Sequence, residues 1–164
     1  MAEFSAGLLM FRRRAKDLGN GLEVFLVHPG GPFWKNKDFG AWSIPKGIAA
    51  TNEQPLQAAQ REFAEETGIT PFGEFFDLGE TKQRADKTVR AWAFENDCSV
   101  KLTSNKFSME WPPRSGRVQE FPEVDRGEWF SLEDARTRMN QRQCVFLDRL
   151  LAALPNPSTN TNPP

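Results

Sequence analysis

The chain has 164 residues, with 21 basic and 22 acidic side chains and a formal net charge of −1 at pH 7. This length predicts a single domain with a sizeable hydrophobic core. Because the chain is close to neutral, it has no overall field that would attract it to DNA or to an anionic membrane. Any recognition of phosphate must therefore be local.

The composition also bears on the cellular compartment. No apolar run is long enough to cross a bilayer. The N-terminal segment MAEFSAGLLMFRRR places its positive charge after the apolar stretch, unlike a signal peptide. Cys98 and Cys144 are too few for a disulfide framework or a zinc site. We therefore expect a cytoplasmic protein without a membrane segment.

The first elements expected along the chain form a β-hairpin. Residues from Phe4 to Arg12 and from Leu22 to Val27 predict two strands, and Gly19-Asn20-Gly21 predicts the turn between them. A loop dense in glycine and proline follows, from His28 to Gly40. His28 is the only histidine of the chain, and we expect it to be a hydrogen-bonding loop residue without a role in proton transfer.

The loop after the hairpin contains large aromatic and basic side chains. Long loops with large aromatic residues are usually functional or packed. One interpretation is that a nucleobase stacks on Trp34 while Lys35 or Lys37 binds phosphate. The other is that the aromatic residues fasten the loop to the domain and the lysines are solvated. The sequence leaves both interpretations open.

A helix is expected after a short strand from Ala41 to Pro45. Pro55 suits the first turn of a helix, and Thr51 or Asn52 just before it can act as the cap. Gly68 lies where a helix C-terminus favours a left-handed residue. These signals predict one helix of moderate length in the first half of the chain.

One side of this helix is acidic. At 100° per residue, Glu62, Glu65 and Glu66 project from one side of the helix, next to an apolar stripe that contains Phe63. Like charges at these spacings repel, and the C-terminal half of a helix disfavours anions. A divalent cation that prefers oxygen ligands, such as Mg²⁺, Mn²⁺ or Ca²⁺, would neutralise the carboxylates. For three carboxylates considered alone, a solvated acidic face is the alternative.

A second hairpin is predicted further along the chain. Two strands, from Phe72 to Glu80 and from Lys87 to Glu95, are joined by a polar turn from Thr81 to Asp86. Basic side chains in this hairpin are candidates for binding a polyphosphate: Lys82, Arg84, Lys87 and Arg90. A solvated edge strand defended by lysines is the alternative.

The last third combines a loop, a late strand and two helices. The segment from Asn96 to Arg117 contains two adjacent prolines and is predicted as an insertion or loop without regular structure. Trp129-Phe130 belongs to a late strand, Ser131 caps a helix to about Gln141, and residues 143–154 show the apolar spacing of a second helix. Residues 155–164 are predicted to be disordered, which leaves a single domain over residues 1–154. Strands around one central helix, with a closing C-terminal helix, predict an α/β sandwich.

A longer pattern runs from Gly47 to Ile69. Its residues match G-x5-E-x7-R-E-U-x-E-E-x-G-U at every specified position, where U is a bulky apolar residue: Gly47, Glu53, Arg61, Glu62, Phe63, Glu65, Glu66, Gly68 and Ile69. At an average residue usage of about 7%, such a match arises by chance on the order of 10⁻⁹ per start position. The segment resembles the signature of the Nudix hydrolase family. The HPGGPFW and W-x-I-P-K-G segments before it resemble a bacterial group of predicted nucleotide pyrophosphohydrolases, with some similarity to dinucleoside polyphosphate hydrolases.

The resemblance implies both a fold and a metal site. The implied fold is an α/β/α sandwich of the α+β class, with a mixed sheet and the strand–loop–helix of the signature. In similar proteins this segment binds Mg²⁺ or Mn²⁺, and the implied ligands here are Glu62, Glu65, Glu66 and the backbone carbonyl of Lys46. A further metal-binding or water-activating glutamate is implied six residues before a late tryptophan. Glu123 has this spacing to Trp129, and Glu120 is the competing candidate.

Other positions of the signature are implied to hold the site in shape or to bind substrate. Arg61 is expected to pair with Glu53 and so to tie the loop to the helix, with Gly47 and Gly68 as structural positions of the motif. Substrate-binding candidates are found in the aromatic loop, before the motif glycine and in the second hairpin: Trp34, Lys35, Lys37, Lys46, Lys87 and Arg90.

The implied activity is Mg²⁺- or Mn²⁺-dependent hydrolysis of a phosphoanhydride in a nucleoside triphosphate or a dinucleoside polyphosphate such as Ap4A. Glu62 is the first candidate for the general base and Glu123 the second, while Lys87 or Arg90 stabilises the leaving phosphate. The alternatives are an RNA 5′-pyrophosphohydrolase, a nucleotide-sensing module without turnover, and an acidic helix that binds Ca²⁺ for stability only. The expected partner is a small nucleotide, and the chain is expected to be a monomer or a homodimer.

Overall fold

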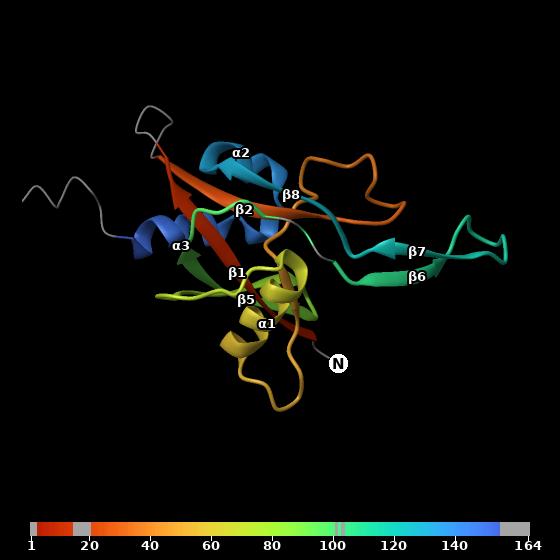
Figure 1. Ribbon diagram of the computed structural model, residues 1–164, viewed down its shortest axis with the longest axis horizontal. Helices are drawn as coiled ribbons and strands as arrows, with labels where there is room; N and C mark the ends of the chain where they lie inside the picture. The colour runs from red at the N-terminus through yellow and green to blue at the C-terminus, as the bar shows by residue number, and fades with distance from the viewer. Residues whose placement is uncertain (1–2, 15–20, 101, 103, 155–164) are drawn as a thin grey trace, which may run out of the picture.

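The computed structural model describes residues 3–14, 21–100, 102 and 104–154 (Figure 1). Gly19 and Asn20 of the predicted turn, and the predicted disordered tail at residues 155–164, lie outside this part of the chain.

Most strands of the described chain form one mixed sheet. Its strand order is β4–β5–β1–β2–β8, built from β4 (Phe76–Arg84), β5 (Lys87–Glu95), β1 (Glu3–Arg13), β2 (Leu22–Pro29) and β8 (Val124–Ser131). The β1–β5 pair is parallel, whereas β4–β5, β1–β2 and β2–β8 are antiparallel. A short sixth strand, β3 (Lys46–Ile48), pairs antiparallel with the first half of β1, where Gly7 lies opposite Lys46. The predicted mixed sheet is confirmed.

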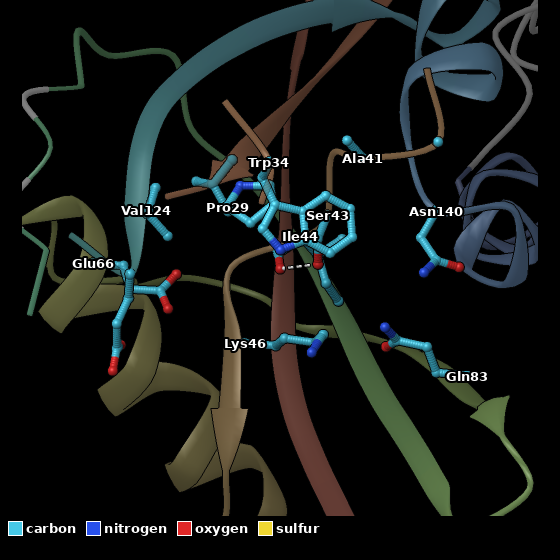
Figure 2. A pocket seen from close by; sticks show the side chains of 13 residues that line it. Pro29, Trp34, Ala41, Ser43, Ile44, Lys46, Glu66, Gln83, Val124 and Asn140 are labelled. Carbon is cyan, nitrogen blue, oxygen red and sulfur yellow. Dashed lines mark hydrogen bonds between the residues drawn. The ribbon is translucent and has the colours of Figure 1, made fainter. Parts of the chain in front are cut away.

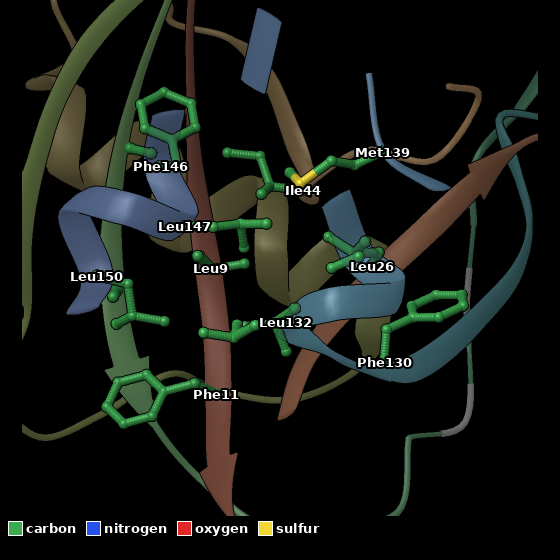
Figure 3. Close-up of a cluster of buried hydrophobic side chains, with 14 of the residues drawn as sticks. Leu9, Phe11, Leu26, Ile44, Phe130, Leu132, Met139, Phe146, Leu147 and Leu150 are labelled. Atoms are coloured by element: carbon green, nitrogen blue, oxygen red, sulfur yellow. The ribbon is translucent and has the colours of Figure 1, made fainter. Parts of the chain in front are cut away.

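Helices cover both faces of this sheet. Along β1, Leu8 and Met10 point to a core shared with α1 (Pro55–Thr67), because successive side chains of a strand alternate between faces. Leu9 and Phe11 point to the opposite core, which is covered by α2 (Leu132–Arg138) and α3 (Val145–Ala153) (Figure 3). The predicted α/β/α sandwich is therefore observed.

The signature helix begins and ends where the sequence predicts, but it is capped differently. Pro55 occupies the first turn, and Gly68 closes the helix with φ 76° and an N–H that donates to the Ala64 carbonyl at 2.9 Å. The N-cap is Gln54, whose side chain makes no capping hydrogen bond, so the expected cap at Thr51 or Asn52 is wrong. Pro55 has no N–H to satisfy, which removes one of the donors that a cap would serve.

Several predicted boundaries shift. Residues 41–45 form only isolated bridges at Trp42 and Ser43, and the paired strand begins at Lys46. The strand predicted from Phe72 begins at Phe76 and continues to Arg84, because an edge strand tolerates polar side chains. The helix that Ser131 caps ends at Arg138 rather than Gln141. The short 3₁₀ helix η1 (Gln141–Gln143) separates it from α3.

The segment predicted to lack regular structure contains part of a hairpin. Strand β6 (Lys106–Glu110) pairs antiparallel with β7 (Val118–Pro122) in a separate two-stranded sheet, the β6–β7 arm, which projects from the body on the right of Figure 1. Pro112 and Pro113 do interrupt regular structure, but they lie in the turn between the two strands. The prediction was wrong for β6 because the prolines bound the strand instead of excluding it.

Candidate active site

A cavity with both apolar and polar walls lies where α1, β3 and the loop after β2 meet (Figure 2). It has a volume of about 280 Å³, and its wall includes Trp34, Lys46, Glu66, Gln83, Glu123 and Asn140. In Figure 2 the ring of Trp34 lies above Lys46, with Glu66 on the α1 side and Gln83 and Asn140 on the other. The cavity wall thus combines the carboxylate of Glu66, the ammonium group of Lys46 and the ring of Trp34.

Glu66 brings a buried carboxylate to this wall. Only 7% of the residue is exposed, and its Oε2 atom is buried without a hydrogen-bond partner within the described chain. Burial raises the pKa of Glu66 from 4.5 to about 8, and the negative charges of Glu62 and Glu123 add to the effect while Lys46 opposes it. Burial and the nearby Lys87 lower the pKa of the Lys46 ammonium. A carboxylate in this position is costly unless a cation comes to it.

Arg61 organises the other acidic residues of the signature. Its Nε and Nη2 atoms donate to both oxygens of Glu53, at 2.8 and 3.0 Å, and Nη1 donates to Glu62 Oε1 at 3.0 Å and to Glu65 Oε1 at 3.3 Å. Glu53 Oε1 also accepts the Ala50 N–H at 3.0 Å. The bidentate Arg61–Glu53 ion pair joins the loop to the helix, as the resemblance implies.

Glu53 should be needed for stability rather than for chemistry. The Arg61 guanidinium lowers the pKa of Glu53 to about 2, so its stabilising effect is present above pH 4.5 and is lost as the pH falls toward 2. Glu53→Gln should therefore lower the melting temperature at pH 7 and flatten the acid side of the stability profile. Thermal unfolding between pH 2 and pH 7 measures both effects. Equal melting temperatures for the variant and the wild type at pH 7 would contradict this assignment.

Glu62 lies directly against the motif glycine. A Cβ atom added at Gly47 would overlap the carboxyl group of Glu62, so any other residue here would displace that carboxyl group from its observed position. Burial raises the pKa of Glu62 even though Arg61 donates to it. Within the described ranges no three His, Cys, Asp or Glu side chains form a closed metal cluster. Arg61 binds Glu62 and Glu65, while Glu66 faces the cavity beside Lys46.

The structure separates the substrate-binding candidates into three groups. Trp34 and Lys46 line the cavity, and Lys37 Nζ lies 5.2 Å from the Trp34 ring. Lys35 lines a second cavity, on the β6–β7 arm. Lys87 and Arg90 do not line the active-site cavity and instead make ion pairs, Lys87 with Glu3 at 3.1 Å and Arg90 with Asp77 at 2.8 Å.

The two candidates for the late glutamate are also separated. Glu123 precedes β8 and lines the cavity, and its negative charge contributes to the raised pKa of Glu66. Glu120 lies on β7, is exposed, and is not part of the cavity wall.

Two buried polar residues support the site. His28 is fully buried, with Nδ1 2.9 Å from Asp125 Oδ1 and Nε2 2.6 Å from the Lys37 carbonyl, and so it fastens the aromatic loop to β8. Gln143 accepts the Ile44 N–H at 3.1 Å and donates to Ser43 Oγ at 3.0 Å. The sequence analysis missed Gln143. A glutamine just before an apolar helix is a weak signal, and its contacts arise only from the fold.

The fold and the cavity together define a class of protein, one that presents carboxylates from a single helix beside a mixed sheet. The chain matches the NUDIX domain model over residues 3–150 and belongs to the Nudix family. The described residues include no helix long and apolar enough to cross a membrane.

The chain is also similar to individual proteins of known sequence or structure. A stretch of 65 residues is 35% identical to an RNA pyrophosphohydrolase of Bartonella henselae and covers 40% of this chain but only 35% of that protein. The structure is similar to an Ap4A hydrolase binary complex from C. elegans, with a TM-score of 0.62 and 24% identity over 90% of this chain and 96% of the other. It is also similar to the NUDIX domain of Shewanella oneidensis NrtR complexed with ADP ribose, with a TM-score of 0.61 and 15% identity over 92% and 89% of the two chains. The structural likenesses establish the fold.

Proposed function

We propose that the protein is a Mg²⁺- or Mn²⁺-dependent hydrolase that cleaves a phosphoanhydride in a nucleoside triphosphate or in a dinucleoside polyphosphate such as Ap4A. The observation that carries the proposal is the buried Glu66 carboxylate, which faces the cavity with one oxygen unpartnered among the described residues. A family member with such a group beside a cavity that also contains Lys46 has the means to hold a cation and an anionic substrate together.

The residues present fit a divalent cation. The donors are carboxylates and a backbone carbonyl, which are the ligands that Mg²⁺ and Mn²⁺ prefer. Glu62, Glu65, Glu66 and Glu123 would hold the ion together with the Lys46 carbonyl, and the unpartnered oxygen of Glu66 is the donor most in need of it. When bound, the ion neutralises charge on phosphate oxygens and acidifies a water molecule.

The chain's own residues account for the other requirements of the reaction. Glu62 is our first candidate for taking the proton from the attacking water, and Glu123 is the second. The Lys46 ammonium in the cavity floor pairs with a phosphate oxygen, and the exposed ring of Trp34 stacks on a nucleobase. Arg61 acts by fixing Glu62 and Glu65. Lys87 and Arg90 serve the leaving phosphate only if substrate displaces their partners Glu3 and Asp77.

A second candidate substrate is the 5′ end of RNA. The observation that favours it is the 65-residue match to an RNA pyrophosphohydrolase. Both candidates share the scissile anhydride and differ in what flanks it. The proposal places one catalytic domain at residues 1–154, in the cytoplasm, as a monomer or a homodimer.

A panel of substrates and metals tests the proposal. Nucleoside triphosphates, dinucleoside polyphosphates and 5′-triphosphorylated RNA are incubated with Mg²⁺, Mn²⁺ or EDTA, and the products are identified by mass spectrometry. We expect turnover of at least one compound with metal and none with EDTA. Saturable binding without product would support a nucleotide sensor instead. A melting temperature that EDTA lowers, without hydrolysis of any compound, would indicate a structural Ca²⁺ site.

A further inference from the structure

The β6–β7 arm is built around a set of aromatic side chains that the proposed reaction does not use. Phe107 and Phe121 are opposite each other in the register, with ring centroids 6.0 Å apart. Met109 and Gln119 form the next pair on the same face. Trp111 follows at the end of β6. A two-stranded hairpin with one aromatic face is marginally stable by itself and requires a partner surface.

The aromatic loop after β2 supplies part of that surface. A Cβ atom at Gly31 would lie 2.9 Å from the Phe107 ring, so loop and arm are in close contact. The rings of Phe33 and Trp111 meet edge to face with centroids 5.4 Å apart, although Phe33 remains 59% exposed. The Gly30 N–H donates to the Glu123 carbonyl at 2.9 Å, which places the root of the arm beside the active-site cavity.

Loop and arm enclose a second cavity of about 560 Å³. Its wall includes apolar and aromatic surface from Pro32, Trp111 and Phe121, together with three polar groups, Lys35, Gln119 and Asp125. Gln119 Nε2 donates to the Trp111 backbone carbonyl at 2.7 Å. The side-chain oxygen of Gln119, Oε1, can then act as an acceptor. An aromatic slot with a few polar groups suits a flat heterocycle that carries amino groups and ring nitrogens.

Neighbouring residues of the same two segments line the two cavities. Pro29 and Trp34 line the active-site cavity, while Pro32 and Lys35 of the same loop line the second one. At the root of the arm, Glu123 and Val124 belong to the first cavity, and their neighbours Pro122 and Asp125 belong to the second. The two cavities are therefore adjacent along both segments, as binding of one molecule with a phosphate chain between two bases requires.

We propose that the cavity between the aromatic loop and the β6–β7 arm binds a second nucleobase of the substrate, so that the enzyme prefers compounds with a base on each side of the phosphate chain or beyond it. This inference rests on the proposed function, because it assumes that the first base and the phosphates lie in the active-site cavity. Dinucleoside polyphosphates and the 5′ end of an RNA chain share this chemistry.

The combination of aromatic and basic side chains at this cavity favours a nucleobase as its occupant. Lys35 is exposed and lines the cavity together with Asp125, and Arg114 and Arg117 lie in the turn at the tip of the arm. Cations interleaved with aromatic rings are the pattern that binds a single nucleotide strand, where stacking supplies affinity and cations bind phosphate.

The test compares substrates with one base and with two. The kinetics of wild type and Trp111→Ala are measured with ATP, with diadenosine tetraphosphate and with a short 5′-triphosphorylated RNA. We expect the variant to raise KM for the two-base compounds by about fivefold to a hundredfold more than for ATP, as loss of one base stack predicts. A selective change for diadenosine tetraphosphate alone, or for the RNA alone, identifies which of the two sources the cavity serves. Trp111→Phe should restore most of the affinity.

Two controls separate this cavity from the fold and from the active site. Val118→Ala changes a 71% exposed residue next to Gln119 on the same strand and should leave every KM unchanged. Thermal unfolding shows whether the arm variants remain folded, and calorimetric binding of the same compounds tests the cavity without turnover. Equal changes for ATP and the two-base compounds, no change at all, or dissociation of a dimer on Trp111→Ala would overturn the inference. Absence of turnover by the wild type on every compound would instead count against the proposed function.

Discussion

Replacing Glu66 by glutamine is expected to lower kcat/KM by about a hundredfold or more, in the range found when one electrostatic contact to a transition state is removed. Glutamine keeps the shape of the side chain but cannot supply the negative charge that holds a divalent ion. The measurement is steady-state kinetics with whichever nucleotide the wild type hydrolyses fastest, at saturating Mg²⁺ or Mn²⁺. If the variant turned over at the wild-type rate, the assignment of Glu66 as a metal ligand would be wrong.

The same substitution should stabilise the protein once metal is removed. The pKa of Glu66 is about 8 in the folded chain, whereas the usual glutamate value of 4.5 applies to the unfolded chain. The folded protein therefore holds this proton more tightly than the unfolded one. Between pH 4.5 and pH 8 the free energy of unfolding of EDTA-treated wild type should therefore fall as the pH rises. Glu66→Gln has no such titration and should lose less stability over that range, as urea unfolding at fixed pH values would show.

Glu65→Gln is the matched control for this experiment. Glu65 is one helical position earlier and exposed, and Arg61 donates to it at 3.3 Å, so its charge carries little desolvation cost. We expect Glu65→Gln to lower turnover as well, but without the gain in metal-free stability at alkaline pH. A similar stability gain in both variants would mean that burial of Glu66 is not the cause.

The signature segment was predictable because its information is local. A proline, a left-handed glycine and a helical period are enough to predict the bounds of α1. The motif spacing of Glu53 and Arg61 predicts the contact between them. The helical period also places Phe63 in the core and the carboxylates beside it. Where one helix supplies most of a site, the sequence predicts most of that site.

The β6–β7 arm was not predictable in the same way. Val118, Gln119 and Glu120 are exposed, so β7 lacks the alternation of apolar and polar residues that marks a half-buried strand. The arm is stabilised by pairing between its own strands and by the loop after β2, about 80 residues earlier in the chain. Only the folded chain brings Phe33 to Trp111.

The ion-pair partners of the basic side chains could not be predicted from the sequence either. Lys87 and Arg90 have the charge required to bind phosphate, and nothing local in the sequence indicates that they already have partners. The parallel pairing of β1 with β5 places Glu3 opposite Lys87, and the edge strand β4 supplies Asp77 to Arg90. Register between distant strands decides which cations remain available, and register is a property of the whole sheet.

Gly47→Ala should be the most damaging of the conservative substitutions in the signature. The new methyl group would overlap the Glu62 carboxyl group, so either Glu62 or β3 must move. Because the clashing atoms are the end of a flexible side chain, we expect a loss of stability at or below the lower end of the about 1–3 kcal/mol typical of overpacking. A displacement of about 1 Å in a catalytic group can reduce the rate about a hundredfold. Thermal unfolding and steady-state kinetics measure the two effects separately.

Two control variants test whether the clash with Glu62 causes the effects of Gly47→Ala. Ile48→Ala alters an exposed residue of the same strand and should change neither stability nor turnover appreciably. Shortening the opposing side chain in the double variant Gly47→Ala/Glu62→Asp should recover stability, because the added methyl group then has room, but it should not recover activity. If Gly47→Ala alone kept wild-type stability and turnover, Glu62 could not be held against the glycine as the structure places it. Arg61 would then bind Glu62 in another position, and the choice of Glu62 over Glu123 as the general base would have to be reversed.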